Sequence, residues 1–151
     1  MKSEFVQGQN NCGDDELPLV YSCSGCSDVA QLTNNIAVEF DKRGLAEMSC
    51  IAGVGGNVKP LVRKAQSGRK IIALDGCPLQ CAKHCLNNAG VKPDLHYVLT
   101  EFGLKKSFHR EFCAEDSEEV MNKIIEDMSA KEMLTKDCTK DYYTAVSLKV
   151  E

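Results

Sequence analysis

Six cysteines of this chain are spaced as metal ligands or reactive thiols are spaced. Two form a Cys-x-x-Cys pair, one stands alone, and three recur at intervals of four residues: Cys23, Cys26, Cys50, Cys77, Cys81 and Cys85. A Cys-x-x-Cys turn is a standard two-ligand unit for zinc. At the start of a helix it is also a redox dithiol, because the helix dipole favours the thiolate. Converging thiols therefore predict a bound metal, an iron–sulfur cluster or thiol chemistry.

The interval of four residues decides which of the last three cysteines can share a metal ion. On a helix, Cys77, Cys81 and Cys85 lie along one stripe, with a rise of about 6 Å per step. Cys77 and Cys81 can bind one ion. Cys85 lies roughly 12 Å from Cys77 along the axis, too far for two zinc–sulfur bonds of about 2.3 Å. Cys85 therefore belongs to a second site, to a larger cluster or to the core.

The predicted four-thiolate site consists of Cys23, Cys26, Cys77 and Cys81, with Cys50 as a substitute or additional ligand. Because Pro78 suits the first position of a helix, we expect Cys77 at the N-cap of that helix. There the dipole and the free backbone N–H groups would stabilise its thiolate. The carboxylate of Asp75 is expected to orient a cysteine or to cap the start of the same helix.

Four short apolar segments are predicted to be strands, and cysteines follow three of them. The segments span residues 17–21, 45–51, 69–75 and 95–100. Helices are predicted between them: Ser27 is expected to cap the first, Gly44 to end it, and an acidic helix begins near Glu115. The alternation predicts an α/β fold with a doubly wound parallel sheet of four strands in the order 2-1-3-4. A fifth, edge strand is expected if residues 142–150 join the sheet.

The predicted architecture is a Rossmann-like or flavodoxin-like three-layer sandwich. In such folds the loops that follow the strands emerge at the C-terminal edge of the sheet, where ligands bind. The cysteines that follow strands 1, 2 and 3 are therefore expected to meet at that edge. We expect residues 1–16 to form an N-terminal arm and residues 17–151 to form a single metal-binding domain.

The composition predicts a compact cytoplasmic protein. Of the 151 residues, 43% are hydrophobic and 26% are charged, which is ordinary for a globular domain. A net charge of −4 and a pI near 5.4 argue against nucleic-acid binding, and no apolar run is long enough to span a membrane. The polar start lacks the apolar core of a secretory signal. Disulfides are rare in the reducing cytoplasm, so nine cysteines indicate ligands or catalysts.

The remaining cysteines, the histidines and the glycine-rich segment are weaker candidates. Cys113 and Cys138 have no partner spacing and are expected to be structural, as is His96 inside its strand. Cys12 is expected to be a free thiol of the N-terminal arm, His84 a solvent-exposed group or one that contacts a ligand, and His109 a loop residue. Gly53, Gly55 and Gly56 do not form a dinucleotide-binding pattern, because their spacing differs and no strong strand precedes them.

The run from Asp75 to Cys85, Asp-Gly-Cys-Pro-Leu-Gln-Cys-Ala-Lys-His-Cys, resembles the DGC family, which is named for its Asp-Gly-Cys signature. The Cys-Ser-Gly-Cys segment that begins at Cys23 and the Ser49-Cys50 pair also resemble that family. The similarity covers about residues 17–112. The resemblance implies a zinc-binding protein whose cysteines are the ligands, and it implies no particular reaction.

Three functions fit these observations. The first is a zinc-binding α/β domain that holds about one ion per chain on the four-thiolate site. The second is an iron–sulfur or thiol-redox enzyme, including a persulfide carrier, that uses the same cysteines. The third is a scaffold whose cysteines serve packing and whose surface binds a partner. We therefore expect zinc, or alternatively an iron–sulfur cluster, as cofactor, and neither nucleic acid nor membrane as partner. Whether the protein is an enzyme stays open.

Overall fold

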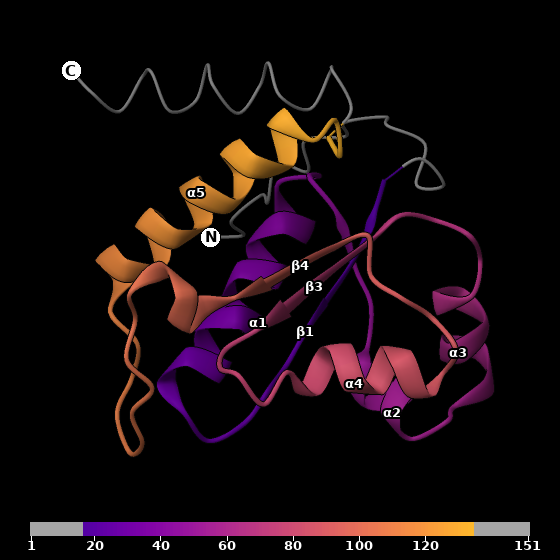
Figure 1. Cartoon of the computed structure of the whole chain (residues 1–151), viewed down its shortest axis with the longest axis horizontal. Coiled ribbons are helices and arrows are strands. Elements are labelled where there is room, and N and C mark those ends of the chain that lie inside the picture. Colours follow the sequence, from indigo (N-terminus) through magenta and orange to yellow (C-terminus); the bar gives the residue numbers. More distant parts are fainter. Residues whose placement is uncertain (1–16, 135–151) are drawn as a thin grey trace, which may run out of the picture.

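The computed structural model describes residues 17–134 as an α/β fold built on a four-stranded parallel sheet (Figure 1). The strands are β1 (Leu19–Ser22), β2 (Glu47–Met48), β3 (Ile71–Asp75) and β4 (Leu95–Val98). Their order is β2-β1-β3-β4, and every neighbouring pair is parallel, which confirms the prediction. The predicted N-terminal arm and the predicted edge strand at residues 142–150 lie outside the described residues.

Helices cover both faces of this sheet (Figure 1). The helices of the described chain are α1 (Asp28–Lys42), α2 (Ile51–Gly55), α3 (Lys59–Ala65), α4 (Cys81–Asn88) and α5 (Ala114–Ala130), with a 3-10 turn, η1 (Leu99–Phe102), after β4. The helices α1 and α5 pack on one face, and α2, α3 and α4 pack on the other. None of the helices within residues 17–134 combines the length and apolarity that a bilayer crossing requires.

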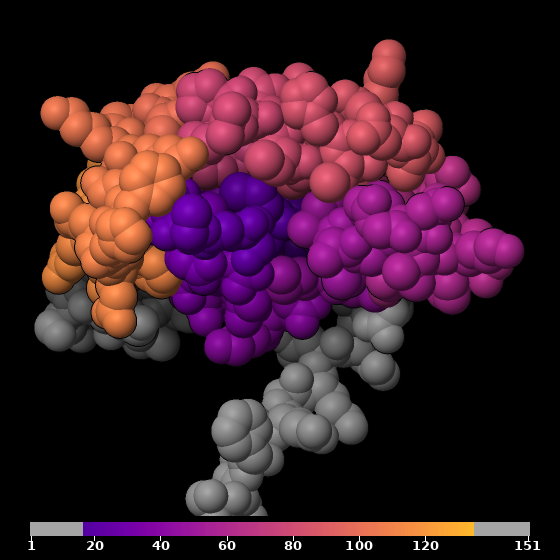
Figure 2. Space-filling view, turned by 90° about the horizontal axis from the view of Figure 1, so that it is seen from below, coloured from indigo at the N-terminus to yellow at the C-terminus, as the bar shows by residue number. Residues whose placement is uncertain are grey.

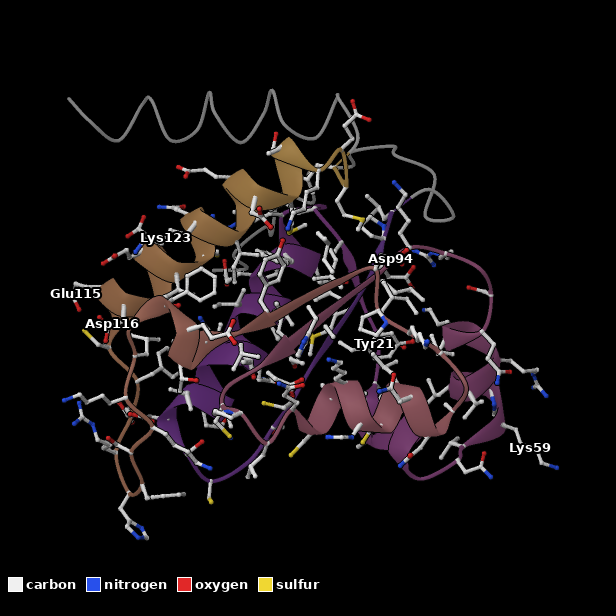
Figure 3. All side chains as sticks on the ribbon, in the orientation of Figure 1. Tyr21, Lys59, Asp94, Glu115, Asp116 and Lys123 are labelled. Atoms are coloured by element: carbon white, nitrogen blue, oxygen red, sulfur yellow. The ribbon has the colours of Figure 1, made fainter. Side chains whose placement is uncertain are left out.

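The helices on both faces explain why the strands are largely apolar. Successive strand residues point to opposite faces, so a strand buried on both sides needs apolar residues at every position. Val20 and Ile72 face the core beneath α1 and α5. Tyr21 and Ala73 face the layer of α2, α3 and α4, and Figure 3 shows the Tyr21 side chain directed into that layer. All five residues of β3 are buried.

The ends of α1 follow from single residues, as predicted. The Ser27 side chain accepts a hydrogen bond from the backbone N–H of Ala30, which satisfies one of the free donors at the helix start. At the other end Gly44 adopts a left-handed φ of 66°, a conformation that costs glycine little. Helix α1 therefore begins directly after the Cys-x-x-Cys turn.

Three predicted boundaries were wrong. The second strand, predicted over residues 45–51, is only two residues long, and helix α2 already begins at Ile51. The fourth strand ends at Val98 and continues as the 3-10 turn. Helix α4 begins at Cys81, so Cys77 is not its N-cap. Pro78 instead occupies the second position of a β-turn, where proline is favoured, and the turn is closed by the Gln80 N–H bonding to the Cys77 carbonyl at 3.1 Å.

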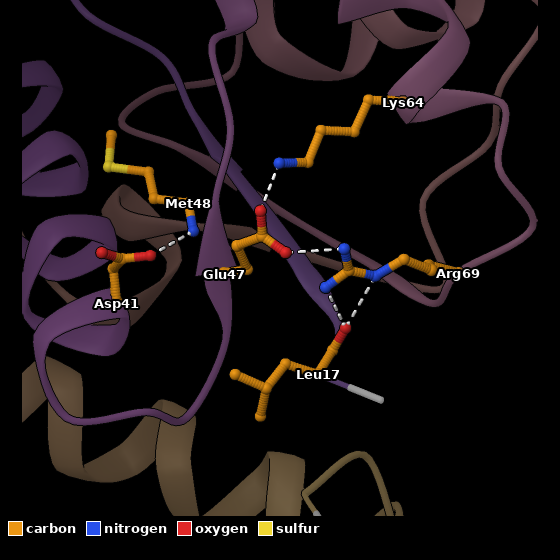
Figure 4. Close-up of polar contacts among 6 residues, drawn as sticks. All are labelled: Leu17, Asp41, Glu47, Met48, Lys64 and Arg69. Carbon is orange, nitrogen blue, oxygen red and sulfur yellow. Dashed lines mark hydrogen bonds and ion pairs between the residues drawn. The ribbon is translucent and has the colours of Figure 1, made fainter. Parts of the chain in front are cut away.

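Glu47 lies in β2, the strand at one edge of the sheet, and links it to α3 and to the segment that precedes β3 (Figure 4). Its carboxylate accepts hydrogen bonds from Lys64 and, at 2.6 Å, from Arg69. The Arg69 guanidinium also donates to the Leu17 carbonyl at 2.6 and 3.0 Å. Burial alone would raise the pKa of the Glu47 carboxyl, but the hydrogen bonds and positive charges of Lys64 and Arg69 outweigh burial and lower this pKa.

We predict that the substitution Glu47→Gln weakens the dependence of folding stability on acid pH. Because the folded-state pKa of Glu47 lies below the unfolded value of 4.5, its ionised form stabilises the fold above that value. This contribution is lost as the pH falls through the folded-state pKa. Urea unfolding between about pH 7 and about pH 3.5 should show a shallower loss of stability for E47Q than for the unchanged protein.

The matched control is Glu39→Gln, which removes a carboxylate of similar exposure whose partners, Lys42 and Arg43, are more exposed than Arg69. Exposed pairs of this kind contribute little to stability, so E39Q should follow the unchanged protein. An identical pH slope for E47Q and the unchanged protein would contradict the role given to Glu47.

Candidate functional site

The parallel topology brings the three cysteine-bearing loops to one edge of the sheet, which we call the thiol edge. Its cysteines follow β1, β2 and β3: Cys23, Cys26, Cys50, Cys77, Cys81 and Cys85. Figure 2 views the molecule from this side. The indigo segment after β1 lies between the magenta segment of α2 and α3, the pink segment of α4 and the orange segment that precedes α5.

Cys23 is the buried member of the thiol edge. Its sulfur accepts a hydrogen bond from the backbone N–H of Gly76 at 3.2 Å, and it lies 3.3 Å from the Thr33 hydroxyl oxygen. Burial raises the pKa of the Cys23 thiol more than these two hydrogen bonds lower it, and the nearby Asp75 and Cys81 raise it further. The contact with Gly76 joins the Cys-x-x-Cys turn directly to the Asp-Gly-Cys segment.

Gly76 lies against the first turn of α1 with no room for a side chain. A Cβ atom at this position would lie 2.8 Å from the Val29 carbonyl carbon and oxygen and 2.8 Å from the Ala30 nitrogen. These are backbone atoms of a helix, so they cannot yield as a flexible side chain would. The glycine of the Asp-Gly-Cys segment is therefore required by the close approach of two backbones.

Asp75 caps the helix that carries Cys81 and Cys85. Its carboxylate is 1% exposed and accepts hydrogen bonds from the backbone N–H groups of Ala82 at 2.8 Å and Lys83 at 3.2 Å. It also lies 2.9 Å from Nε2 of His96 on β4. The N-cap residue Gln80 makes no side-chain cap bond, so Asp75 supplies the capping acceptor from the end of β3. This confirms the capping role predicted for Asp75, and it explains the structural role of His96.

Cys85 lies where α2 packs against α4, and Cys50 lies at the start of α2. A Cβ atom at Gly55 would lie 3.0 Å from the Cys85 sulfur, so the glycine of α2 leaves space for this thiol. Burial raises the pKa of the Cys85 thiol, and the nearby Cys81 and Asp75 add to that effect. Cys50 is the N-cap of α2, and its sulfur accepts a hydrogen bond from the Gly53 N–H at 3.3 Å.

A loop of residues 103–110 lies beside the thiol edge. Asp28 at the start of α1 holds this loop by two hydrogen bonds with Ser107: its N–H donates to the Ser107 carbonyl at 3.0 Å, and its carboxylate accepts from the Ser107 N–H at 2.7 Å. An antiparallel bridge between Ser27 and Phe108 adds to this contact. The loop places Nζ of Lys106 3.5 Å from the sulfur of Cys77.

The six predicted site cysteines share one edge but differ in exposure. Cys23 is buried, Cys77 and Cys85 are partly exposed, and three are exposed: Cys26, Cys50 and Cys81. Among residues 17–134 no three His, Cys, Asp or Glu side chains are grouped closely enough to hold a metal ion as they stand. In Figure 3 yellow sulfur atoms lie along the lower side of the molecule, near the ends of β1 and β3.

The structure also shows site residues that the sequence did not indicate. Lys106 and the Asp28–Ser107 contact were missed, because they join positions 29 and 79 residues apart and no local spacing reports them. The structural role predicted for Cys113 was wrong: this residue is exposed at the N-cap of α5, where its thiol bonds to Glu115. Cys12 and Cys138 lie outside the described residues.

Comparison with known proteins finds a family model that matches more than half of this chain. The DGC domain model matches residues 19–124, a range that includes the whole thiol edge and Asp75. A protein of Pseudomonas aeruginosa named anaerobic and virulence modulator AnvM is 61% identical over 105 residues, which is 70% of this chain and 80% of that protein. No solved structure matches the chain significantly.

We predict that Gly76→Ala destabilises the protein by about 2 kcal/mol or more, because the new Cβ must displace the first turn of α1. Gly25→Ala is the matched control in the neighbouring turn, since a Cβ there meets the Ala30 Cβ at 3.8 Å, an ordinary contact. Urea unfolding of both variants measures the difference. Similar stability losses in G76A and G25A would exclude the steric role of Gly76.

A second prediction concerns the bond between His96 and Asp75. His96→Leu removes the bond to a buried carboxylate and should cost about 1–3 kcal/mol of folding stability. His96→Gln retains an N–H donor of similar reach, so it should recover part of this loss. Amide hydrogen exchange at Ala82 and Lys83 should be faster in H96L than in H96Q, because both amides bond to Asp75. If exchange at these amides is equal in the two variants, His96 does not support the cap.

Proposed function

The chain belongs to the DGC-domain family, and we propose that it is a metal-binding protein that holds zinc at the thiol edge. The proposed ligands are Cys23, Cys26, Cys77 and Cys81, with Cys50 and Cys85 at the same edge. The observation that carries the proposal is the hydrogen bond from the Gly76 N–H to the Cys23 sulfur. This bond brings the Cys-x-x-Cys turn against the segment that carries Cys77.

The donor atoms and their surroundings fit a zinc ion. Four thiolates are a usual ligand set for structural zinc. Because the thiols are not grouped around one centre, the exposed side chains of Cys26 and Cys81 would turn toward Cys23 when the ion binds. The Gly76 N–H can keep its bond to the Cys23 sulfur, and such outer contacts orient metal ligands.

Bound zinc would supply a cross-link between parts of the chain that are far apart in sequence. Cys23 and Cys26 precede α1, Cys77 follows β3, and Cys81 begins α4. Binding would therefore tie both layers of the sandwich together at the thiol edge, and its free energy would add to folding stability.

A second function, thiol-redox or iron–sulfur chemistry on the same cysteines, is favoured by a different observation. The sulfurs of Cys23 and Cys77 each accept a hydrogen bond from a nitrogen donor, Gly76 and Lys106 respectively. The Cys77 sulfur is also partly exposed, so a reacting molecule could reach it from solution. The similar protein is named an anaerobic modulator, and a redox-responsive thiol edge would suit that name.

We predict about one zinc ion per chain in protein purified without air, and a colourless absorption spectrum. Cys77→Ser should strip the metal, because serine offers no soft sulfur ligand. Elemental analysis of protein purified in parallel gives the stoichiometry. A brown protein with iron and labile sulfide would instead support the second function.

The matched control is Cys113→Ser, which replaces an exposed cysteine at the N-cap of α5 whose sulfur bonds to Glu115. C113S should retain the full metal content. Equal metal content in C77S and C113S, or no metal in the unchanged protein, would refute the proposed zinc site.

A further inference from the structure

The loop of residues 103–110 brings a positive charge to the most accessible part of the Asp-Gly-Cys segment. Nζ of Lys106 lies 3.5 Å from the Cys77 sulfur and 5.2 Å from the centre of the Phe108 ring. Phe108 is 51% exposed, so its ring lies at the surface beside the ammonium group. Cys77 is itself partly exposed, and molecules in solution can therefore reach the pair.

The position of Lys106 is fixed by the contacts of its loop. Asp28 is buried, and its carboxylate accepts hydrogen bonds from the N–H groups of Ser107 and Val29. Nε of Arg110 lies 3.8 Å from the other carboxylate oxygen of Asp28. The residue next to Lys106 is therefore held to the start of α1, and the lysine side chain is directed to Cys77.

The ammonium group of Lys106 forms no ion pair with a carboxylate in the described part of the chain. Within residues 17–134 no carboxylate oxygen lies within ion-pair distance of its ammonium group, whereas Arg110 pairs with Asp28. Asp75 is close in sequence to Cys77, but its carboxylate is buried and bonded to Ala82, Lys83 and His96. The accessible sulfur of Cys77 therefore lies beside a cation that no carboxylate of residues 17–134 pairs with.

We propose that Lys106 and Cys77 form a binding site for small anions that react with the Cys77 thiol or bind beside it. The lysine attracts the negative charge of the incoming molecule, and the sulfur provides the nucleophile or ligand. The inference rests on the proposed function only in taking Cys77 as a site residue. The expected ligands are thiol-directed molecules that carry a carboxylate or an anionic sulfur, in preference to neutral molecules of the same shape.

Two alkylating reagents that differ in charge, iodoacetate and iodoacetamide, test the proposal on metal-free protein. In both reactions the Cys77 thiolate attacks the methylene carbon, a sulfur–carbon bond forms, the carbon–iodine bond breaks, iodide leaves with the electron pair, and the thiol proton goes to water. Iodoacetate is an anion and iodoacetamide is neutral. The ratio of their two rates therefore reports attraction of the anion, since any change in thiolate fraction affects both rates equally.

Cys81 provides an internal control in the same measurement. Trypsin cleaves after Lys70 and Lys83, so one peptide carries both Cys77 and Cys81, and fragment ions separate the two sites. Lys106→Met should lower the iodoacetate-to-iodoacetamide ratio at Cys77 about fivefold at low salt, and by less at high salt. The ratio at Cys81 should change much less. Lys106→Arg should retain most of the ratio.

Lys105→Met is the matched control, because Lys105 is an exposed neighbour with the same charge. K105M should leave the ratio at Cys77 close to that of the unchanged protein. An unchanged ratio in K106M would overturn the inference, and so would an equal decrease in K105M and K106M. Because no metal takes part, a protein that binds no zinc but shows the predicted ratios would refute the proposed function and leave this inference standing.

Discussion

The thiol edge depends on the close approach of Gly76 to the first turn of α1. Parallel strands bring their following loops to one side of a sheet, but neighbouring strands still lie about 4.8 Å apart. The absent side chain of Gly76 lets the end of β3 reach the Val29 carbonyl and the Ala30 nitrogen, while its N–H bonds to the Cys23 sulfur. One residue thus fixes the end of β3 both to the first thiol of the Cys-x-x-Cys turn and to the helix after it.

The residues on either side of Gly76 create opposite electrostatic surroundings. On the inner side, Asp75 is buried, caps α4 and adds negative charge near Cys23 and Cys85, whose pKa values are raised mainly by burial. On the outer side, Cys77 is partly exposed and accepts a hydrogen bond from Lys106. The three-residue signature therefore combines a helix cap, a backbone contact and an accessible thiol, and each residue type suits its task.

Local patterns predicted the elements, whereas contacts between distant segments decided the site. Runs of apolar residues and the Ser27 and Gly44 signals sufficed for the strand order and for α1. The predicted N-cap at Cys77 failed because Pro78 suits a β-turn as well as a helix start, and the chain forms the turn that the Gln80 N–H closes on the Cys77 carbonyl. Lys106 was not predictable, because its position depends on a loop held by Asp28 from 79 positions away.

The difference between inner and outer thiols also bears on how a metal ion would bind. The raised pKa of Cys23 means that this thiol keeps its proton in the metal-free protein, so the ion must displace that proton. Cys26 and Cys81 are exposed and would meet the ion first, from solvent, whereas Cys23 is buried and would bind it last. Binding would then proceed from the exposed thiols to the buried one and become stronger with rising pH. In this order the Gly76 contact holds the last ligand in place before the first ones arrive, which reduces the conformational entropy lost when the site closes.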